Sequence, residues 1–193
     1  MFLDRDGVLN RKLPEGCYVT SWSEFELLPG VPEAIRKLTR AGLRVLVVSN
    51  QRGIALGLYT VEAVQEIHSE LQKVLLSYGT SIGGFYFCPH DKSACRCRKP
   101  LPGMFENALA DFPEIDAQTS VMIGDSMSDI EFGRRLGMRT ILVQGDTSRQ
   151  KPNAKIASAL ADMRFPSLPD AVDALLEELQ PQSESGNRQT SIQ

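Results

Sequence analysis

Residues 2–10 read Phe-Leu-Asp-Arg-Asp-Gly-Val-Leu-Asn, and this stretch gives the clearest indication of the architecture. A short apolar segment, Phe2-Leu3, runs directly into two carboxylates, Asp4 and Asp6, and then into Gly7. Acidic residues at the end of an apolar strand are typical of open α/β sheets, which bind ligands at the carboxyl ends of their strands. Because strands usually have about five residues, we expect either an unusually short first strand or a start codon further upstream.

The rest of the chain alternates segments typical of strands with segments typical of helices. The run Leu43–Val48 is rich in apolar and β-branched residues, as in a strand buried on both faces. From Thr60 to Tyr78 apolar residues recur every three or four positions, as in a long amphipathic helix. Further strands are expected at 85–87, 121–123 and 140–143, and further helices at 32–41, 104–112, 126–136 and 170–179. This order predicts an α/β fold with a doubly wound, mostly parallel sheet and helices on both faces.

Length and composition are those of one soluble domain. The 193 residues are 42% hydrophobic, and 21 basic against 24 acidic side chains give a net charge of −3, which argues against a general nucleic-acid binder. We find neither an apolar run of about 20 residues nor a secretion leader, so we expect a cytoplasmic protein. A single domain is expected over residues 1–179. Residues 180–193, in which Ile192 is the only aliphatic side chain, are expected to form a disordered tail.

Carboxylates gather at the expected carboxyl ends of the strands. They are Asp4, Asp6 and Asp125, with Asp129 one turn into the next helix. Neighbouring carboxylates raise one another's pKa unless a cation offsets their charge, and Mg²⁺ is held by one or two carboxylates with further oxygen ligands. Each Asp alone could instead cap a helix, and Asp129 could lie on a solvated helix face. Together they predict a Mg²⁺ site.

A second cluster combines three cysteines and one histidine within ten residues. Its members are Cys88, His90, Cys95 and Cys97. Three thiolates and one imidazole are the ligands of a closed tetrahedral Zn²⁺ site, and four protein ligands leave no open position, so we predict a structural zinc-stabilised loop. Disulfides are not expected in a cytoplasmic protein, and Cys17 is interpreted as a free thiol. His68, in the middle of the long helix, is expected to be at the surface or half-buried.

Four ordered motifs between residues 2 and 145 resemble those of the haloacid-dehalogenase-like phosphohydrolases. They are residues 2–10, Ser49-Asn50-Gln51, Arg98-Lys99-Pro100 and residues 124–129. The resemblance implies a Rossmann-like sheet and a two-step phosphoryl transfer. Asp4 would be the nucleophile that forms an aspartyl-phosphate, and Asp6 would protonate the leaving alcohol and then activate water.

The remaining residues of these motifs have expected roles around the phosphoryl group. Asp4, the backbone carbonyl of Asp6, and Asp125 would hold Mg²⁺. Lys99 would supply a fixed positive charge, and the Ser49 hydroxyl would donate a hydrogen bond. Asp129 would bind a metal-bound water or Lys99.

The spacing of the motifs narrows the resemblance to one branch. Only 42 residues separate Asp6 from Ser49, so we expect no large cap domain, and the zinc loop and residues 11–29 would form the rim of the pocket. Segments 49–55, 85–90 and 95–100 resemble the D-glycero-D-manno-heptose 1,7-bisphosphate 7-phosphatases and their relatives, the histidinol-phosphatases. The first of these activities, removal of the C7 phosphate, would serve the synthesis of nucleotide-activated heptose for lipopolysaccharide or another surface glycan.

The same resemblance implies a set of substrate contacts. They are Asn10, Tyr18, Asn50, Gln51, Arg52 and Arg98. A cationic rim of Lys12, Arg52, Arg96 and Arg98 would favour a sugar bisphosphate, whereas the ammonium group of histidinol phosphate would prefer acidic neighbours. The short spacing from His90 to Cys95 is nearer to that of the histidinol-phosphatases, which remain the alternative.

The alternative to an enzyme is a binding protein, in which an inactive scaffold carries a zinc module that binds nucleic acid or a protein partner. The acidic net charge and the lack of stacking aromatic residues beside the cations argue against it, and it leaves the carboxylates without a task. We therefore expect a monomeric enzyme that acts on a small phosphorylated metabolite, with no nucleic-acid or membrane partner.

Overall fold

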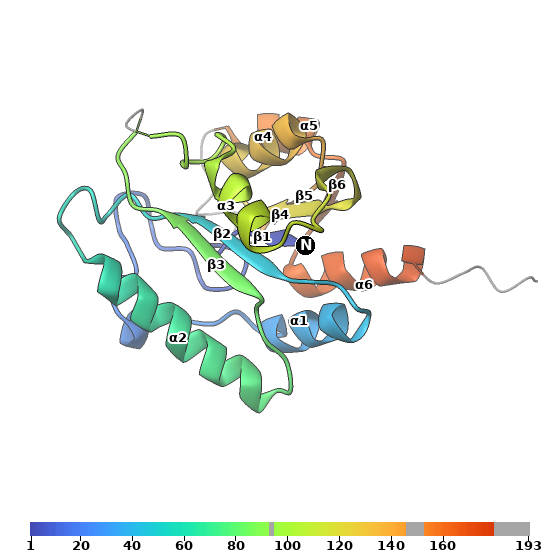
Figure 1. The fold of residues 1–193 in the computed structure, drawn as a ribbon, viewed down its shortest axis with the longest axis horizontal. Helices are drawn as coiled ribbons and strands as arrows, with labels where there is room; N and C mark the ends of the chain where they lie inside the picture. Colours follow the sequence, from blue (N-terminus) through green and yellow to red (C-terminus); the bar gives the residue numbers. More distant parts are fainter. Residues whose placement is uncertain (93–94, 146–152, 180–193) are drawn as a thin grey trace, which may run out of the picture.

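The computed structural model describes residues 1–92, 95–145 and 153–179, and Figure 1 shows their arrangement. The strands are β1 (Phe2–Leu3), β2 (Leu46–Asn50), β3 (Gly84–Cys88), β4 (Val121–Gly124), β5 (Arg139–Val143) and β6 (Met163–Phe165). The helices are α1 (Val31–Arg40), α2 (Val61–Ser77), α3 (Gly103–Asp111), α4 (Met127–Leu136), α5 (Ala154–Leu160) and α6 (Leu168–Leu179), with short 3-10 helices η1 (Trp22–Glu24) and η2 (Ala117–Thr119).

All strands of the sheet run parallel, in the order β3-β2-β1-β4-β5-β6. The chain builds one half of the sheet outward from β1 to β3, and then the other half from β4 to β6. Sheets of this kind bind ligands where the strand order reverses, here between β1 and β4. The predicted doubly wound α/β sheet is therefore confirmed.

The first strand has only two residues, yet it lies at the centre of the sheet between β2 and β4. Backbone hydrogen bonds extend its pairing at both ends: the Leu46 amide donates to the Met1 carbonyl, and the Asp4 amide donates to the Ile123 carbonyl, both at 2.9 Å. These bonds hold Asp4 at the point where β1 ends. The nucleophile position predicted from the sequence thus belongs to the most enclosed strand.

Alternate side chains of each strand point to opposite faces of the sheet, and each face is covered by helices. Leu3, Val47 and Ile123 pack with α1, α2 and α6, whereas Phe2, Val48 and Met122 pack with α3 and α4. Figure 1 shows these two helical layers on either side of the strands. Helix α5 adds a small cluster against α4 and β5.

Some features differ from the sequence predictions. The elements α5 and β6 were not predicted, because segments this short show too few residues for a helical or alternating period. The prediction for His68 was wrong: its side chain is 5% exposed and stacks on Phe85 with 4.4 Å between ring centroids. The predicted tail, residues 180–193, lies outside the described residues.

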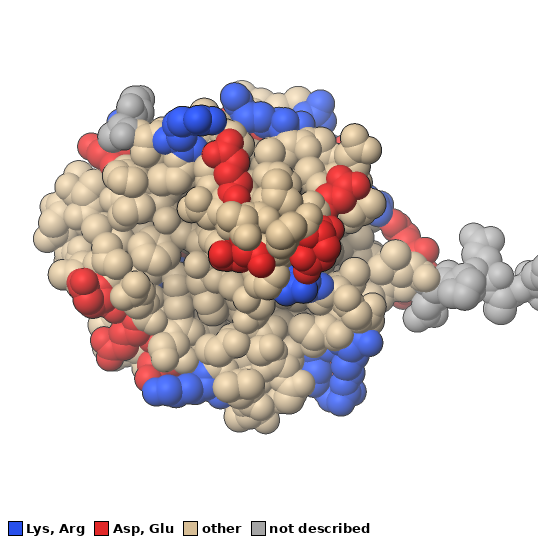
Figure 2. All heavy atoms as spheres, viewed as in Figure 1, with Lys and Arg blue, Asp and Glu red and all other residues tan. Residues whose placement is uncertain are grey.

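The surface carries charges of both signs. On the face seen in Figure 2, acidic and basic side chains are interspersed among uncharged residues and form no continuous field of one sign. None of the helices in the described part of the chain is long and apolar enough to cross a bilayer. Within the same residues, the segments that join β1 to α1 and β2 to α2 contain turns, bends, η1 and the isolated β-bridges of Asn10 with Asp6 and Leu27, and no separate cap domain.

Candidate active site

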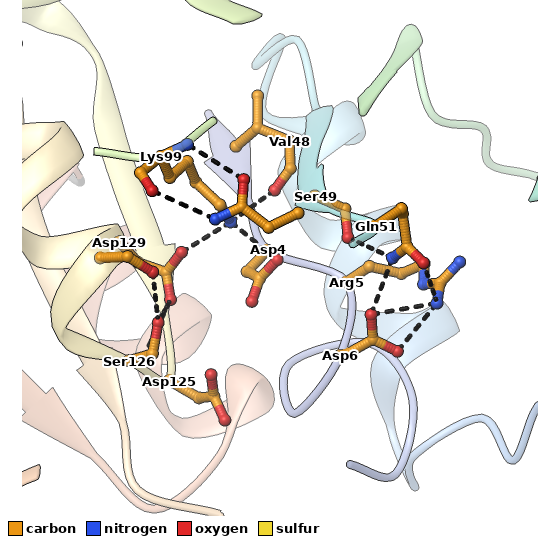
Figure 3. A network of polar contacts seen from close by, with 12 residues as sticks. Asp4, Arg5, Asp6, Val48, Ser49, Gln51, Lys99, Asp125, Ser126 and Asp129 are labelled. Atoms are coloured by element: carbon orange, nitrogen blue, oxygen red, sulfur yellow. Dashed lines mark hydrogen bonds and ion pairs between the residues drawn. The ribbon is translucent and has the colours of Figure 1, made fainter. Parts of the chain in front are cut away.

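A cavity of about 560 Å³ opens at the carboxyl ends of β1, β2 and β4. The motif residues on its wall are Asp4, Asp6, Ser49, Asn50, Gln51, Arg52, Arg98, Lys99, Asp125 and Asp129. The loop after β1 contributes residues 12–19 to the opposite wall. Figure 3 shows how the central side chains converge from strands that are far apart in the sequence.

Lys99 is the buried cation of the site. Its ammonium group donates to Asp4 at 2.8 Å and to the Val48 carbonyl at 2.7 Å, and lies 2.6 Å from Asp129. Two hydrogen bonds and one ion pair thus hold the ammonium group in place. Burial lowers the pKa of Lys99, but the charges of Asp129 and Asp4 outweigh burial and raise it, so the side chain is charged at neutral pH.

The carboxylates around Lys99 carry more negative charge than one lysine offsets. Burial and the charge of Asp129 raise the pKa of Asp4 to about 7, although Lys99 opposes this shift. Burial also opposes ionisation of Asp129, but Lys99 outweighs it and lowers that pKa. A further cation beside Asp4 would therefore stabilise its ionised form.

Asp4, Asp125 and Asp129 offer carboxylate oxygens that all lie within 4.8 Å of one another. Asp125 forms an ion pair with Lys12. Gly7 allows its close approach, because a Cβ on Gly7 would lie 2.3 Å from the Asp125 Oδ2 and the residue has φ of 96°. Hard oxygen donors at this spacing fit Mg²⁺.

Asp6 points toward Arg5 and Gln51 rather than toward this cluster (Figure 3). The Arg5 Nη2 donates to both carboxylate oxygens, and Asn10 and Gln51 donate one bond each, all at 3.0 Å. Burial raises the pKa of Asp6, but the Arg5 charge and these hydrogen bonds outweigh it, and the net shift is downward.

The Ser49-Asn50-Gln51 segment mainly supports other site residues. The Asn50 side chain holds the backbone of Lys99: it accepts from the Lys99 amide at 3.0 Å and donates to the carbonyl at 3.2 Å. Ser49 is buried and accepts a hydrogen bond from Gln51 at 2.7 Å. Asn10 is fully buried against Asp6 and is not part of the cavity wall, so the structure does not bring it to the substrate side as the sequence suggested.

Tyr18, Arg52 and Arg98 lie on the wall near the mouth of the cavity, together with Lys12. Arg52 forms an ion pair with Asp91 of the cysteine loop. The Arg98 Nη1 is buried and makes no hydrogen bond with the described residues. The fourth expected rim cation, Arg96, is instead highly exposed beside Glu106 and away from the cavity.

The cysteine and histidine cluster is assembled at the end of β3. Cys88 lies 3.4 Å from Cys95, and the His90 Nδ1 lies 3.2 Å from Cys97. Bonds from one Zn²⁺ to two such atoms would separate them by about 3.5–3.8 Å, so the cluster fits a tetrahedral metal site. The loop continues through Arg98 into Lys99. Cys17 is a free, exposed thiol outside this cluster.

Two residues of the site were not found from the sequence. Arg5 is 1% exposed and contacts Asp6, and no role was predicted for it from the sequence. Tyr59 is 7% exposed and donates to Gln51 at 2.7 Å. An arginine inside an otherwise apolar and acidic stretch was the one available signal for Arg5.

Comparisons with known proteins agree with this geometry. A family model described as HAD-hydrolase-like matches residues 96–171. The D-glycero-alpha-D-manno-heptose-1,7-bisphosphate 7-phosphatase of Mycobacterium tuberculosis is 38% identical over 169 residues, which cover 87% of this chain and 86% of the relative. The D-glycero-beta-D-manno-heptose-1,7-bisphosphate 7-phosphatase of Pseudomonas putida is 35% identical over 145 residues, which cover 75% and 81%.

A solved structure of a heptose bisphosphate phosphatase is also similar to this chain. The D,D-heptose 1,7-bisphosphate phosphatase from B. bronchiseptica, complexed with magnesium and phosphate, matches with a TM-score of 0.79 at 30% identity, over 92% of this chain and 98% of that one. The sequence likeness and the shared fold extend over most of both chains. This chain therefore belongs to the heptose-1,7-bisphosphate 7-phosphatase family of HAD-like hydrolases.

Proposed function

We propose that this chain is a Mg²⁺-dependent phosphatase that removes the C7 phosphate of D-glycero-D-manno-heptose 1,7-bisphosphate and leaves the phosphate at C1. The observation that carries the proposal is the buried Asp4–Lys99–Asp129 cluster at the end of the cavity. A carboxylate held 2.8 Å from a buried ammonium group, beside open space, is a nucleophile with positive charge already in place for a phosphoryl group.

The reaction has two steps on Asp4. A carboxylate oxygen of Asp4 forms a bond to phosphorus while the bond from phosphorus to the C7 oxygen breaks. Asp6, whose pKa is lowered in the free site, takes up a proton when the anionic substrate binds and gives this proton to the departing oxygen. Water then attacks the phosphorus of the aspartyl-phosphate and loses a proton to Asp6. The bond from phosphorus to Asp4 breaks, which releases phosphate and restores both carboxyl groups.

Two metal ions complete the proposal. Asp4, the backbone carbonyl of Asp6, and Asp125 would hold Mg²⁺, which supplies positive charge to the phosphoryl oxygens. The cluster of Cys88, His90, Cys95 and Cys97 would hold a structural Zn²⁺. A match to a relative's structure that is complexed with magnesium and phosphate supports the first assignment.

The cationic mouth of the cavity supports a bisphosphate substrate. Lys12, Arg52 and Arg98 all lie on the cavity wall. These side chains suit the phosphate at C1, which stays on the product. Charge-assisted bonds from arginine to phosphate are among the stronger polar contacts in proteins.

The test is phosphate release with Mg²⁺ from three esters: the α and β anomers of heptose 1,7-bisphosphate, and histidinol phosphate. We expect one heptose anomer to exceed histidinol phosphate at least about hundredfold in kcat/KM, which corresponds to about 2.7 kcal/mol of transition-state binding. Preference for histidinol phosphate would overturn the proposed substrate.

Asp4→Asn should abolish turnover without unfolding the protein, because the amide is close in size to the carboxylate but is not a nucleophile. Asp173→Asn changes an exposed carboxylate on α6 and serves as the matched control. Turnover that survives Asp4→Asn would contradict the mechanism.

A further inference from the structure

We propose that Gln51 is a positioning residue that fixes the carboxyl group of Asp6, and that Tyr59 and Arg5 fix Gln51 in turn. The inference rests on the proposed function and concerns the orientation of Asp6, which acts there first as an acid and then as a base. It also changes the role expected for Gln51, which the sequence suggested as a substrate contact.

The amide of Gln51 has no polar atom left for a substrate. Its Nε2 donates to Asp6 at 3.0 Å and to Ser49 at 2.7 Å, and its Oε1 accepts from Tyr59 at 2.7 Å and from Arg5 at 3.3 Å. A primary amide has two N–H donors and two lone pairs on oxygen, so all four are used. The residue as a whole is only 2% exposed.

Arg5 determines which way the amide faces. A guanidinium group only donates hydrogen bonds, so the atom of Gln51 that faces Arg5 must be the oxygen. The nitrogen is thereby turned toward Asp6. Arg5 itself is 1% exposed and bonds both carboxylate oxygens of Asp6, so Arg5, Gln51 and Asp6 contact one another in pairs (Figure 3).

Tyr59 is held equally firmly. Its side chain is buried, and burial raises the pKa of its phenol to about 12, so the hydroxyl remains a neutral donor to Gln51. Its ring packs against Gly53, where a Cβ would lie 2.1 Å from the Tyr59 Cε1. A side chain at position 53 would therefore displace the Tyr59 ring from its present place.

The contact matters because an acid must lie within hydrogen-bond reach of the oxygen that it protonates, and a misplacement of about 1 Å can cost about a hundredfold in rate. The rate depends strongly on protonation by Asp6 when the leaving group is poor, as the C7 alkoxide is. It depends little on protonation for p-nitrophenolate, which departs without a proton. Asp6 also acts as the base in hydrolysis of the aspartyl-phosphate, a step that both esters share, so comparing the first turnover of the two esters isolates its role as an acid.

The experiment measures kcat and KM of wild type, Gln51→Leu and Tyr59→Phe with heptose 1,7-bisphosphate and with p-nitrophenyl phosphate. We expect kcat for the heptose ester to fall about a hundredfold in Gln51→Leu and about tenfold in Tyr59→Phe, with KM unchanged. With p-nitrophenyl phosphate we expect the first-turnover burst of p-nitrophenolate, which reports formation of the aspartyl-phosphate and not its hydrolysis, to stay within about threefold of wild type in rate in both variants. Tyr86→Phe, which removes a hydroxyl bonded to Asp111 outside the cavity, should match wild type with both esters.

Three results would overturn the inference. A raised KM for the heptose ester with unchanged kcat would make Gln51 a substrate contact. A first-turnover burst with p-nitrophenyl phosphate that slows as much as the reaction of the heptose ester would indicate a structural role alone, and no loss in either folded variant would show that Asp6 needs no support. If wild type hydrolyses neither ester, the proposed function fails and the inference fails with it, whereas the other results leave that function standing.

Discussion

His68 shows how a single buried side chain links stability to pH. Burial lowers its pKa from 6.5 to about 3, and its ring is enclosed by Phe85 and Phe87. The folded protein therefore keeps His68 neutral at pH values where the unfolded chain takes up a proton. Below pH 6.5 this difference favours unfolding, and the loss grows until the pH reaches about 3.

We expect His68→Phe to flatten the pH dependence of stability. At pH 5 the wild type should have lost about 2 kcal/mol through His68 relative to neutral pH, and the variant should not show this loss. Urea unfolding at pH 7.5, 6 and 5 measures the free energy of unfolding of both proteins. Because only the change in this free energy with pH is compared, any constant effect of the new ring cancels. Equal changes in the two proteins would mean that His68 is protonated in the folded state.

At the scale of single residues, the sequence predicted which side chains meet but not all of their contacts. The meeting of Asp4, Lys99, Asp125 and Asp129 could be predicted because few other tasks require these residues at the ends of strands. The contacts of Gln51 could not be predicted, since they include Arg5, which lies 46 positions earlier in the chain. Contacts of this kind form only when β1 and β2 lie side by side.

At the scale of elements, the loop that carries Cys88, His90, Cys95 and Cys97 leads from β3 to Arg98 and Lys99 of the site. It leaves the sheet at Cys88, the last residue of β3, and two residues after Cys97 it delivers Lys99 to Asp4. The Arg98 backbone also hydrogen-bonds to Cys95, and this bond helps to lower the pKa of that thiol to about 7 although burial opposes the shift. Metal binding should therefore couple to both stability and turnover.

Cys95→Ser should reduce bound zinc from about one ion per chain to nearly none, and should lower the melting temperature and the turnover, because metal binding contributes to folding. Elemental analysis and thermal unfolding measure these changes. Cys17→Ser, which alters the exposed thiol outside the cluster, should behave as wild type. A wild-type protein without zinc, or a variant that keeps it, would contradict the assignment.

The boundaries of an element could be predicted where apolar residues repeat regularly over several turns of a helix. Helix α2 begins within one residue of its expected start and carries the predicted buried stripe, which includes Val64, Ile67 and Leu71. The three residues of β6 show no such stripe, and β6 becomes a strand only by pairing with β5. Its position therefore depends on tertiary contacts that no local pattern contains.

At the scale of the whole molecule, the topology explains why catalytic groups from distant segments meet. Every strand is parallel, so all carboxyl ends lie at one edge of the sheet, and β1 between β2 and β4 brings three motifs together. The loops beyond this edge close the cavity. The order of strands and helices allowed this arrangement to be predicted, whereas the shape of the cavity mouth depends on loop contacts such as Arg52 with Asp91.

The central claim is that Asp4 carries the phosphoryl group during turnover, and trapping that intermediate tests it most directly. Enzyme mixed with heptose 1,7-bisphosphate and Mg²⁺ is quenched in acid within one turnover and reduced with borohydride, which converts an aspartyl-phosphate to homoserine. Mass spectrometry of the N-terminal peptide should find homoserine at position 4 in wild type and none without substrate. Turnover with Asp4 unmodified, or homoserine at Asp6 or Asp125 instead, would contradict the account.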